Sequence, residues 1–187
     1  RHTDNSPDKP FFCFVSYVDP HDPYDPPAPY DTMFSPDEMQ EPLPSTWIQH
    51  GNEILRESRK FCNYESIADN PQAVKKLRAL YHGSIRFIDD QIERIVRLAA
   101  QRNLAENTII VFTTDHGDMI GDHGLITKGV KFFDKGIRCP LIVCGKNVKT
   151  GISGRLVCSL DLFPSFCDFA EVPATNRPPL EGKSFAQ

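Results

Sequence analysis

The chain has 187 residues, a formal net charge of −4, and 40% hydrophobic and 25% charged residues, as expected for one globular domain. The negative charge and the lack of a Lys/Arg run give no support for nucleic-acid binding. No apolar run approaches the ~20 residues of a membrane-spanning helix, so we expect no membrane span.

The start of the chain and its cysteines bear on its origin. The chain begins at Arg1 rather than Met, so we expect a segment cut from a longer protein. None of the six cysteines lies in a CxxC or other metal-binding spacing. Cys13, Cys139, Cys144 and Cys158 lie in or beside apolar runs, where a free thiol behaves as a small core residue. Reduced thiols slightly favour a cytoplasmic location.

The first predicted element is a central strand at residues 11–18 (FFCFVSYV), which are almost continuously apolar. Prolines stop this strand and restrain the turn that presents His21. A lone loop histidine is usually solvated, but a position beyond the carboxyl end of a strand favours a role at a site. Residues 26–70 form a proline-rich, irregular insertion, typical of a lid or a substrate-facing excursion. Three residues of this insertion are predicted to anchor it rather than to contact substrate: Trp47, His50 and Tyr64.

A long helix follows, with Asn70 as N-cap and Pro71 at the first helical position, and it extends to about Arg102. One face is an apolar stripe with steps of three and four residues. The stripe comprises Val74, Leu77, Tyr81, Ile85, Ile88, Ile92, Ile95 and Ala99. We expect Asp89 and Asp90 to pair with neighbouring arginines rather than to bind a metal. The other face is predicted to be solvated, and it carries Lys75, Arg78, Arg86, Glu93 and Arg97.

The most informative stretch is the β-branched run 108–114, a predicted strand, and the loop that follows it. Three carboxylates and two imidazoles lie within nine residues of this loop, among glycines that let backbone approach a ligand. They are Asp115, His116, Asp118, Asp122 and His123. The loop therefore predicts a site for a divalent metal and an anionic substrate. A right-handed strand–helix–strand crossover would make the two strands parallel and bring His21 and Asp115 to the same sheet edge.

The remaining elements complete an α/β pattern. A polar turn at 131–138 leads to a predicted short strand at 140–144, and a further strand is predicted at 156–160. A helix is predicted from Asp161, as N-cap, to Ala170, and the tail is rich in proline. We therefore predict a largely parallel sheet sandwiched between helices.

The segment TTDHGDMIGDHGLITKG (113–129) resembles the metal-and-sulfate loop of the type I sulfatase family. That family belongs to the alkaline-phosphatase-like superfamily, with phosphonate monoester hydrolases as close relatives. The resemblance continues, in family order, through FVSYVDPHDPY, YHGSIRFIDDQIERIV, RCPLIVCG and SLDLFPSFCDFAEV, and thus spans nearly the whole chain. It implies a sulfatase-like fold that is incomplete, with residues 1–187 as part of a catalytic domain.

The resemblance also implies roles for single residues. Asp115 and His116 match metal ligands, Lys128 matches the lysine that contacts the sulfate, and His21 matches the histidine near the leaving-group oxygen. His21 and Lys128 would be the catalytic and substrate-binding groups of this chain. An ammonium and a metal neutralise charge on a transferring sulfuryl group, and an imidazole can protonate the leaving alkoxide. The other loop residues match the family without a firm ligand role, and we interpret them as groups that support the ligands: Asp118, Asp122 and His123.

Two departures from the family pattern matter. Many sulfatases carry Asp-Asn where this chain has Asp115-His116, and an imidazole suits Mn²⁺ or Zn²⁺ better than Ca²⁺. We expect one divalent metal, Ca²⁺ or Mn²⁺ before Mg²⁺ or Zn²⁺. The formylglycine nucleophile of the family, made from Cys in a C-x-P-S-R-like motif, and the first metal carboxylates are not found in this chain. Both lie upstream in the family order, so we expect a missing N-terminal half and no turnover by this chain alone.

Three functions stay open at this point. The parent protein is expected to hydrolyse a sulfate ester of a small molecule or sugar. A phosphonate monoester or phosphodiester hydrolase would use the same site. A non-catalytic remnant that binds anions or a partner is the alternative from another class.

Overall fold

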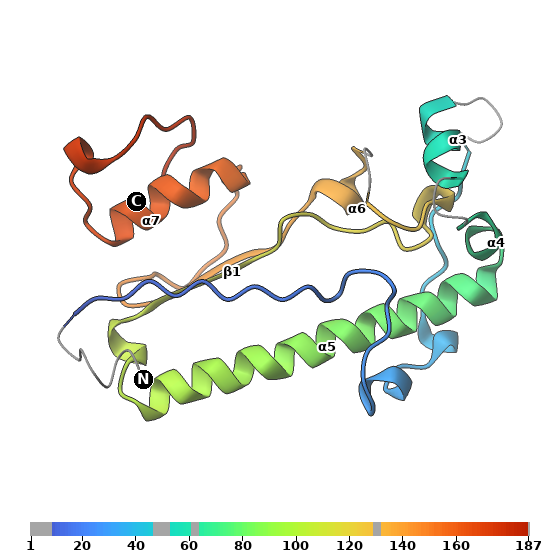
Figure 1. Ribbon diagram of the computed structural model, residues 1–187, viewed down its shortest axis with the longest axis horizontal. Helices are drawn as coiled ribbons and strands as arrows, with labels where there is room; N and C mark the ends of the chain where they lie inside the picture. The colour runs from blue at the N-terminus through green and yellow to red at the C-terminus, as the bar shows by residue number, and fades with distance from the viewer. Residues whose placement is uncertain (1–8, 47–52, 61–63, 129–131, 187) are drawn as a thin grey trace. The chain divides into compact units, whose positions relative to one another are not determined.

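In a computed structural model of the protein, the described residues are 9–46, 53–60, 64–128 and 132–186. The chain divides into two compact units, residues 1–93 with 120–127 and residues 94–119 with 128–187. The helices and strands are α3 (Glu53–Lys60), α4 (Glu65–Ala68), α5 (Pro71–Gln101), β1 (Ile109–Thr113), α6 (Asp134–Ile137), β2 (Leu141–Gly145) and α7 (Leu162–Phe169), joined by short 3₁₀ helices (Figure 1). Within the described ranges, no helix combines the length and the apolar character needed to cross a membrane.

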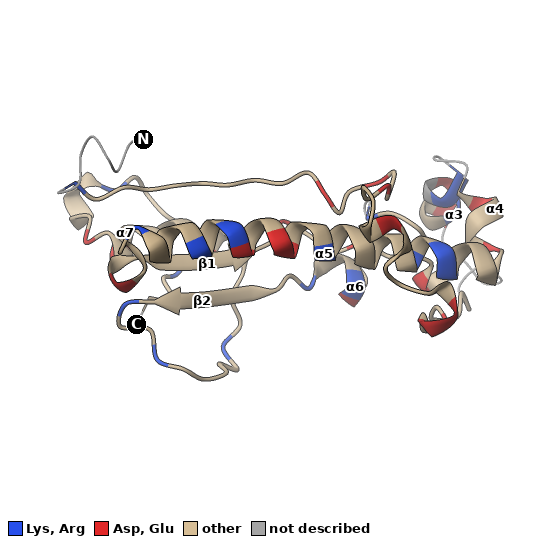
Figure 2. Ribbon diagram, turned by 90° about the horizontal axis from the view of Figure 1, so that it is seen from below, with Lys and Arg blue, Asp and Glu red and all other residues tan. Residues whose placement is uncertain are grey.

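Helix α5, the long green helix of Figure 1, confirms the predicted element and its start. The Asn70 side-chain oxygen accepts hydrogen bonds from the backbone N–H groups of Gln72 (3.0 Å) and Ala73 (3.2 Å). This cap satisfies donors that the first turn of any helix leaves without an intrahelical partner. Basic residues near both ends of the helix flank a group of acidic ones, Asp89, Asp90 and Glu93 (Figure 2). The apolar stripe is buried at Val74 and Leu77 but exposed at Ile85 and Ile95, so only the first turns supply core.

The first unit has a small apolar core around the start of α5. Tyr24, Leu77, Ile120 and Ile126 form this core, and Tyr24 meets the ring of Tyr81 edge-on at 5.8 Å between centroids. Residues 120–127 thus bring the second half of the predicted site loop onto α5.

The insertion 26–70 is less irregular than predicted, because it contains α3 and α4. It is fixed to α5 where Tyr30 donates a hydrogen bond to Asp90 (2.7 Å) and packs against the ring of Phe87. A Cβ at Gly83 would lie 2.3 Å from the Tyr30 carbonyl oxygen, so only glycine permits this approach. Trp47 and His50 lie outside the described residues. As predicted, Tyr64 acts as an anchor, since it packs against the core of the first unit.

The second unit contains a two-stranded antiparallel sheet, in which Ile109 pairs with Gly145 and Thr113 with Leu141. Both strands were predicted from the sequence, at 108–114 and 140–144. The largely parallel sheet is not confirmed, since β1 and β2 are the paired strands of the described chain.

Two predicted strands are not formed in the described structure. Residues 11–18 run without regular secondary structure (Figure 1). Their apolar side chains are exposed. Residues 156–160 likewise form no strand. An apolar run becomes a strand only when a neighbour satisfies its backbone N–H and C=O groups, and the described residues provide no such neighbour here. The expectation that His21 and Asp115 share a sheet edge required a strand at residues 11–18. Because this strand is not formed, that expectation has no support in the described structure.

The cysteines correct a second expectation. Cys13, Cys139, Cys144 and Cys158, predicted to be core residues, are exposed, whereas Cys167 on α7 is buried. These five thiols are free, and Cys62 lies outside the described residues. The first four were predicted to lie in the core because they are in or beside apolar runs. Within the described residues, these positions stay exposed to solvent.

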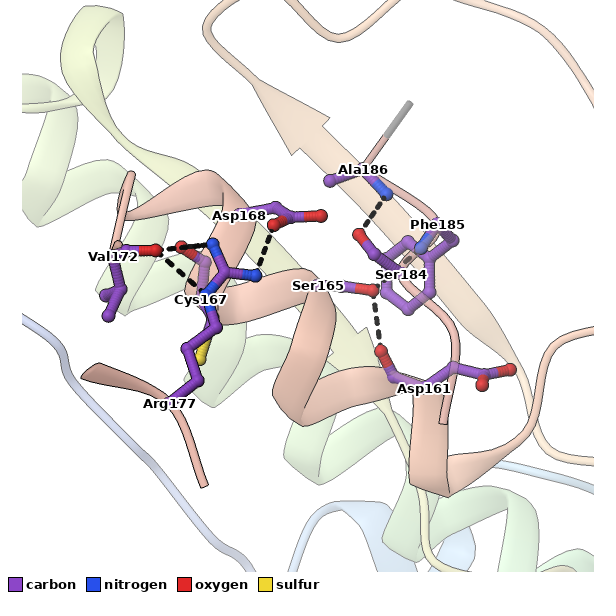
Figure 3. Close-up of polar contacts among 9 residues, drawn as sticks. All are labelled: Asp161, Ser165, Cys167, Asp168, Val172, Arg177, Ser184, Phe185 and Ala186. Carbon is purple, nitrogen blue, oxygen red and sulfur yellow. Dashed lines mark hydrogen bonds and ion pairs between the residues drawn. The ribbon is translucent and has the colours of Figure 1, made fainter. Parts of the chain in front are cut away.

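Helix α7 organises the end of the chain through polar contacts (Figure 3). The buried Ser165 hydroxyl donates to the Asp161 carbonyl oxygen (2.6 Å) and accepts from the Phe185 N–H (2.9 Å). Arg177 forms an ion pair with Asp168 (2.6 Å), as Figure 3 shows. Asp161 precedes α7 as predicted, but its carboxylate accepts from the N–H groups of Cys158 and Lys183 instead of capping the helix.

These contacts shift two carboxyl groups toward the ionised form. Hydrogen bonds from the backbone N–H groups of Cys158 and Lys183 lower the pKa of Asp161 below its ordinary value of 3.8. A side-chain hydrogen bond from Ser184, followed by one from Arg177, lowers the pKa of Asp168 in the same way. The tail therefore depends on two ionised carboxylates.

Candidate metal and anion site

The candidate metal pair, Asp115 and His116, lies directly after β1, where the strand ends at Thr113. The side chains converge, with 3.5 Å between His116 Nε2 and Asp115 Oδ2. The Asp115 carboxylate also accepts a hydrogen bond from the His116 backbone N–H (3.0 Å), which holds it beside the imidazole. Both side chains are accessible to solvent, Asp115 more so. The structure thus brings the two predicted ligands together.

Hydrogen bonding fixes which imidazole nitrogen of His116 has a lone pair. The Nδ1 atom lies 2.8 Å from the carbonyl oxygen of Gly117, which can only accept, so Nδ1 carries the proton. In the neutral ring, Nε2 then directs its lone pair toward the Asp115 side. Metal-bound histidines commonly donate their second N–H to a carbonyl or carboxylate in this way. Two ligands bound to one cation at about 2.0–2.2 Å are separated by about 3 Å, close to the distance found, so this pair fits a divalent metal.

A close backbone contact holds the loop after the metal pair. Gly117 donates its N–H to the Gly136 carbonyl oxygen (2.9 Å), at the edge of helix α6. A Cβ at Gly117 would lie 1.9 Å from the Lys135 carbonyl oxygen, so no other residue fits without movement of α6. Among the residues that the structure describes, no group of three or more His, Cys, Asp or Glu could hold a metal. The metal pair therefore offers two ligands, not a closed site.

Asp122 was predicted to support the metal ligands, but the structure shows a different contact. Its carboxylate accepts from the Arg78 guanidinium (2.6 Å) and from the Leu43 N–H (2.8 Å), and its side chain is only 7% exposed. Arg78 also donates to the carbonyl oxygens of Ile120 (2.9 Å) and Gln40 (2.9 Å). We call this network the Arg78–Asp122 clamp. It joins α5, the loop at 120–124 and the insertion within the first unit.

Arg78 also corrects the prediction of a solvated helix face, because its side chain is only 14% exposed. Lys75 is similarly covered and pairs with Glu41 (2.6 Å). The sequence contained a signal for this, since Arg78 follows Val74 by four residues and so lies one turn above a buried position. The expected surface pairing of Asp89 and Asp90 is confirmed, at 3.2 Å and 2.6 Å from Arg86.

The other predicted loop residues have distinct surroundings. His123 donates its backbone N–H to the Leu43 carbonyl oxygen (2.9 Å), and its Nδ1 lies 3.2 Å from the Pro44 carbonyl oxygen. Asp118 accepts a hydrogen bond from the Met119 N–H (3.3 Å). Lys128 is half-buried and directly follows the loop segment of the first unit. His123 thus helps to anchor the insertion. The roles of Asp118 and Lys128 stay predictions.

His21 lies in the first unit, on the proline-restrained turn that the sequence predicts. Its backbone N–H donates to the Val18 carbonyl oxygen (3.2 Å), which closes the turn. Its Nδ1 lies 2.7 Å from the Asp22 carbonyl oxygen and 3.1 Å from the Asp22 carboxylate. Sequence reasoning missed Asp22, because a carboxylate among several in a turn gives no signal of its partner.

The sequence of this chain is similar to sequences of known proteins. A sequence model of the family described as Sulfatase matches residues 2–172. An arylsulfatase from Clostridium perfringens is 35% identical over 171 residues, covering 89% of this chain and 35% of that protein.

Two solved structures are similar in fold. A phosphonate monoester hydrolase from Silicibacter pomeroyi matches with a TM-score of 0.84 and 24% identity, covering 97% of this chain and 38% of that one. A phosphonate monoester hydrolase from Agrobacterium radiobacter matches with a TM-score of 0.74 and 25% identity, covering 99% and 39%. The chain therefore spans little more than a third of the length of these relatives.

Proposed function

Because the chain belongs to the sulfatase family, we propose that it forms part of a metal-dependent hydrolase of sulfate esters. The observation that carries this proposal is the metal pair, which directly follows β1 in a chain that the family model matches almost throughout. A carboxylate and an imidazole lone pair at 3.5 Å leave room for a cation between them. The chain would supply these two ligands to the metal.

The residues of this chain would have three tasks. The metal pair holds the cation, which when bound neutralises charge on the sulfate oxygens. Lys128 places an ammonium against the same anionic group, and this attraction grows as charge shifts in the transition state. His21 donates a proton to the bridging oxygen as the alcohol leaves. A formylglycine expected upstream would supply the oxygen nucleophile.

Two finer points belong to the proposal. His116 favours Mn²⁺ over Ca²⁺ as the resident metal, because imidazole nitrogen is a better ligand for the softer ion. Residues 11–18 would enter a parallel sheet when the rest of the catalytic domain is present, which would cover side chains that are exposed in this chain.

Phosphonate monoester hydrolysis is the second candidate function. It is supported by the fold match to the Agrobacterium radiobacter enzyme at 25% identity, and by a histidine ligand that suits metals other than Ca²⁺. Sulfate and phosphonate monoesters both present anionic oxygens and a bridging oxygen, so the same four groups of this chain would serve either.

The test measures hydrolysis of an aryl sulfate and an aryl phosphonate monoester by the complete protein. We compare the wild type with Asp115→Ala and Lys128→Ala, and use Asp37→Ala and Lys149→Ala as matched changes at exposed positions. We expect sulfate turnover to dominate and each site substitution to cost about a hundredfold or more in kcat/KM, with the controls near wild type. Dominant phosphonate turnover with the same losses would favour the second candidate. An inactive, metal-replete wild type would favour a non-catalytic remnant.

A further inference from the structure

The turn that carries His21 is held at both ends. The His21 N–H to Val18 hydrogen bond closes it on one side, and the buried Tyr24 ring anchors it in the core of the first unit on the other. Tyr24 has a positive φ of 27°, an uncommon value that its packing against Tyr81 maintains. The imidazole is therefore presented from a fixed backbone.

The proton on one imidazole nitrogen of His21 is determined by its neighbours. Two oxygens of Asp22 lie within hydrogen-bond distance of Nδ1, the carbonyl at 2.7 Å and the carboxylate at 3.1 Å. Neither oxygen has a proton to give when the carboxyl is ionised, so Nδ1 must be the donor. The proton that this ring can transfer is then the one that Nε2 carries in the imidazolium form.

A second group holds the Asp22 carboxylate. The Tyr64 hydroxyl donates to Asp22 Oδ2 at 3.1 Å, while Asp22 Oδ1 faces the His21 ring. Tyr64 follows the insertion helix α3 and packs against the core of the first unit, so its position is fixed by apolar contact. The order is thus Tyr64, Asp22, His21, with each group positioned by the one before it.

We propose that Asp22, held by Tyr64, is the positioning residue that makes His21 a proton donor to the leaving group. The inference rests on the proposed function. As the S–O (or P–O) bond to the leaving oxygen breaks, its electron pair moves to that oxygen, which takes the proton from Nε2. The attacking oxygen nucleophile forms the new bond, and His21 becomes neutral with its proton retained on Nδ1 toward Asp22. No net charge is left on the ring or on the departing alcohol.

The test uses leaving groups that differ in their need for a proton. The complete protein is assayed with the phenyl and 4-nitrophenyl esters of whichever acid, sulfuric or phosphonic, the wild type hydrolyses. Phenoxide needs protonation, whereas nitrophenoxide departs without it. Asp22→Asn removes the charge and keeps the shape, Asp22→Glu retains the charge, and Asp25→Asn is the matched change at an exposed position of the same segment.

We expect Asp22→Asn to lower kcat about tenfold or more on the phenyl ester and less than about threefold on the nitrophenyl ester. Asp22→Glu should recover part of the loss, and Asp25→Asn should resemble wild type. Since Asp22 acts through His21, adding Asp22→Asn to His21→Ala should cause no further loss. Tyr64→Phe, which removes only a hydroxyl, should show a smaller loss with the same leaving-group preference.

Other results would overturn the inference. Equal losses on the two esters, or an additive loss in the double variant, would show that Asp22 does not act through His21. Wild-type kinetics in Asp22→Asn beside a strong loss in His21→Ala would leave the proposed function intact and remove this inference alone. A wild type that hydrolyses neither ester, or an unaffected His21→Ala, would remove the proposed function and the inference with it.

Discussion

The Arg78–Asp122 clamp allows a quantitative prediction for the Arg78→Ala substitution. The change removes the guanidinium and leaves the Asp122 carboxylate, 7% exposed, with the Leu43 N–H as its remaining named donor. Truncating one partner of a buried ion pair costs about 3–5 kcal/mol, because the other charge stays buried without compensation. The carbonyl oxygens of Ile120 and Gln40 also lose a donor, each worth about 0.5–1.5 kcal/mol where water does not replace it. We expect a total loss of about 3–8 kcal/mol in the free energy of unfolding, with the lower end reached if water replaces both lost hydrogen bonds.

The same helix provides a matched control. Arg86 also lies on α5 and forms ion pairs, with Asp89 and Asp90, but its side chain is 47% exposed. Exposed pairs contribute about 0–1 kcal/mol, so Arg86→Ala should cost little. Both changes replace arginine by the best helix former, so helix propensity does not distinguish them. Arg78→Lys should give an intermediate loss, because an ammonium keeps the charge but cannot reach three acceptors in the guanidinium geometry.

Urea denaturation of the complete protein, followed by circular dichroism, measures these differences. Hydrogen exchange gives a local readout, because the Leu43 amide should lose protection in Arg78→Ala and keep it in Arg86→Ala. A loss for Arg78→Ala no larger than for Arg86→Ala, with unchanged exchange at Leu43, would refute the buried clamp.

Three further predictions concern backbone fit, pH and metal. Gly121→Ala should destabilise the loop by several kcal/mol, since Gly121 has φ +91° and a Cβ would lie 2.4 Å from Val74 Cγ1; thermal unfolding measures this. The lowered pKa values of Asp161 and Asp168 stabilise the tail above the unfolded value of 3.8, and this stabilisation disappears as pH falls through the folded values. Pepsin cleavage of residues 171–186 should therefore start at a higher pH in Asp168→Asn but not in the exposed control Glu171→Gln. Chelation should abolish turnover of the complete protein, and restoration by Mn²⁺ better than by Ca²⁺ would support the metal assignment, whereas unchanged turnover would contradict it.

The elements that could be predicted from the sequence are those whose causes are local. The start of α5 depends on Asn70 and Pro71, two adjacent residues, and its course on a periodic pattern. Strand β1 could also be predicted, because its β-branched run is local, and Asp115 and His116 directly follow it; their role as metal ligands stays a prediction. The run 11–18 could not, since a strand requires a partner that a single segment does not specify.

The loop 115–123 shows why a cluster of polar residues in sequence need not become a cluster in space. Ile120, Gly121 and His123 all have positive φ, at 44°, 91° and 56°, so the chain reverses sharply between them. This reversal directs Asp122 to Arg78, a residue 44 positions earlier, instead of to the metal pair. Counting carboxylates within nine residues therefore overestimated the number available to a metal. The positive φ angles that set the course of this loop were not predicted from the sequence.

The clamp also explains how the insertion and the loop at 120–124 can depend on each other. Leu43 donates to Asp122 and accepts from His123, so the insertion is hydrogen-bonded in both directions to the loop that continues into Lys128. A change in the insertion that displaces Leu43 would leave the Asp122 carboxylate with only the Arg78 contact and would free the loop before Lys128. Insertions of this kind are commonly variable because they contact different substrates. In this chain, the part near Leu43 is constrained by the clamp, so we expect more sequence variation in the rest of the insertion.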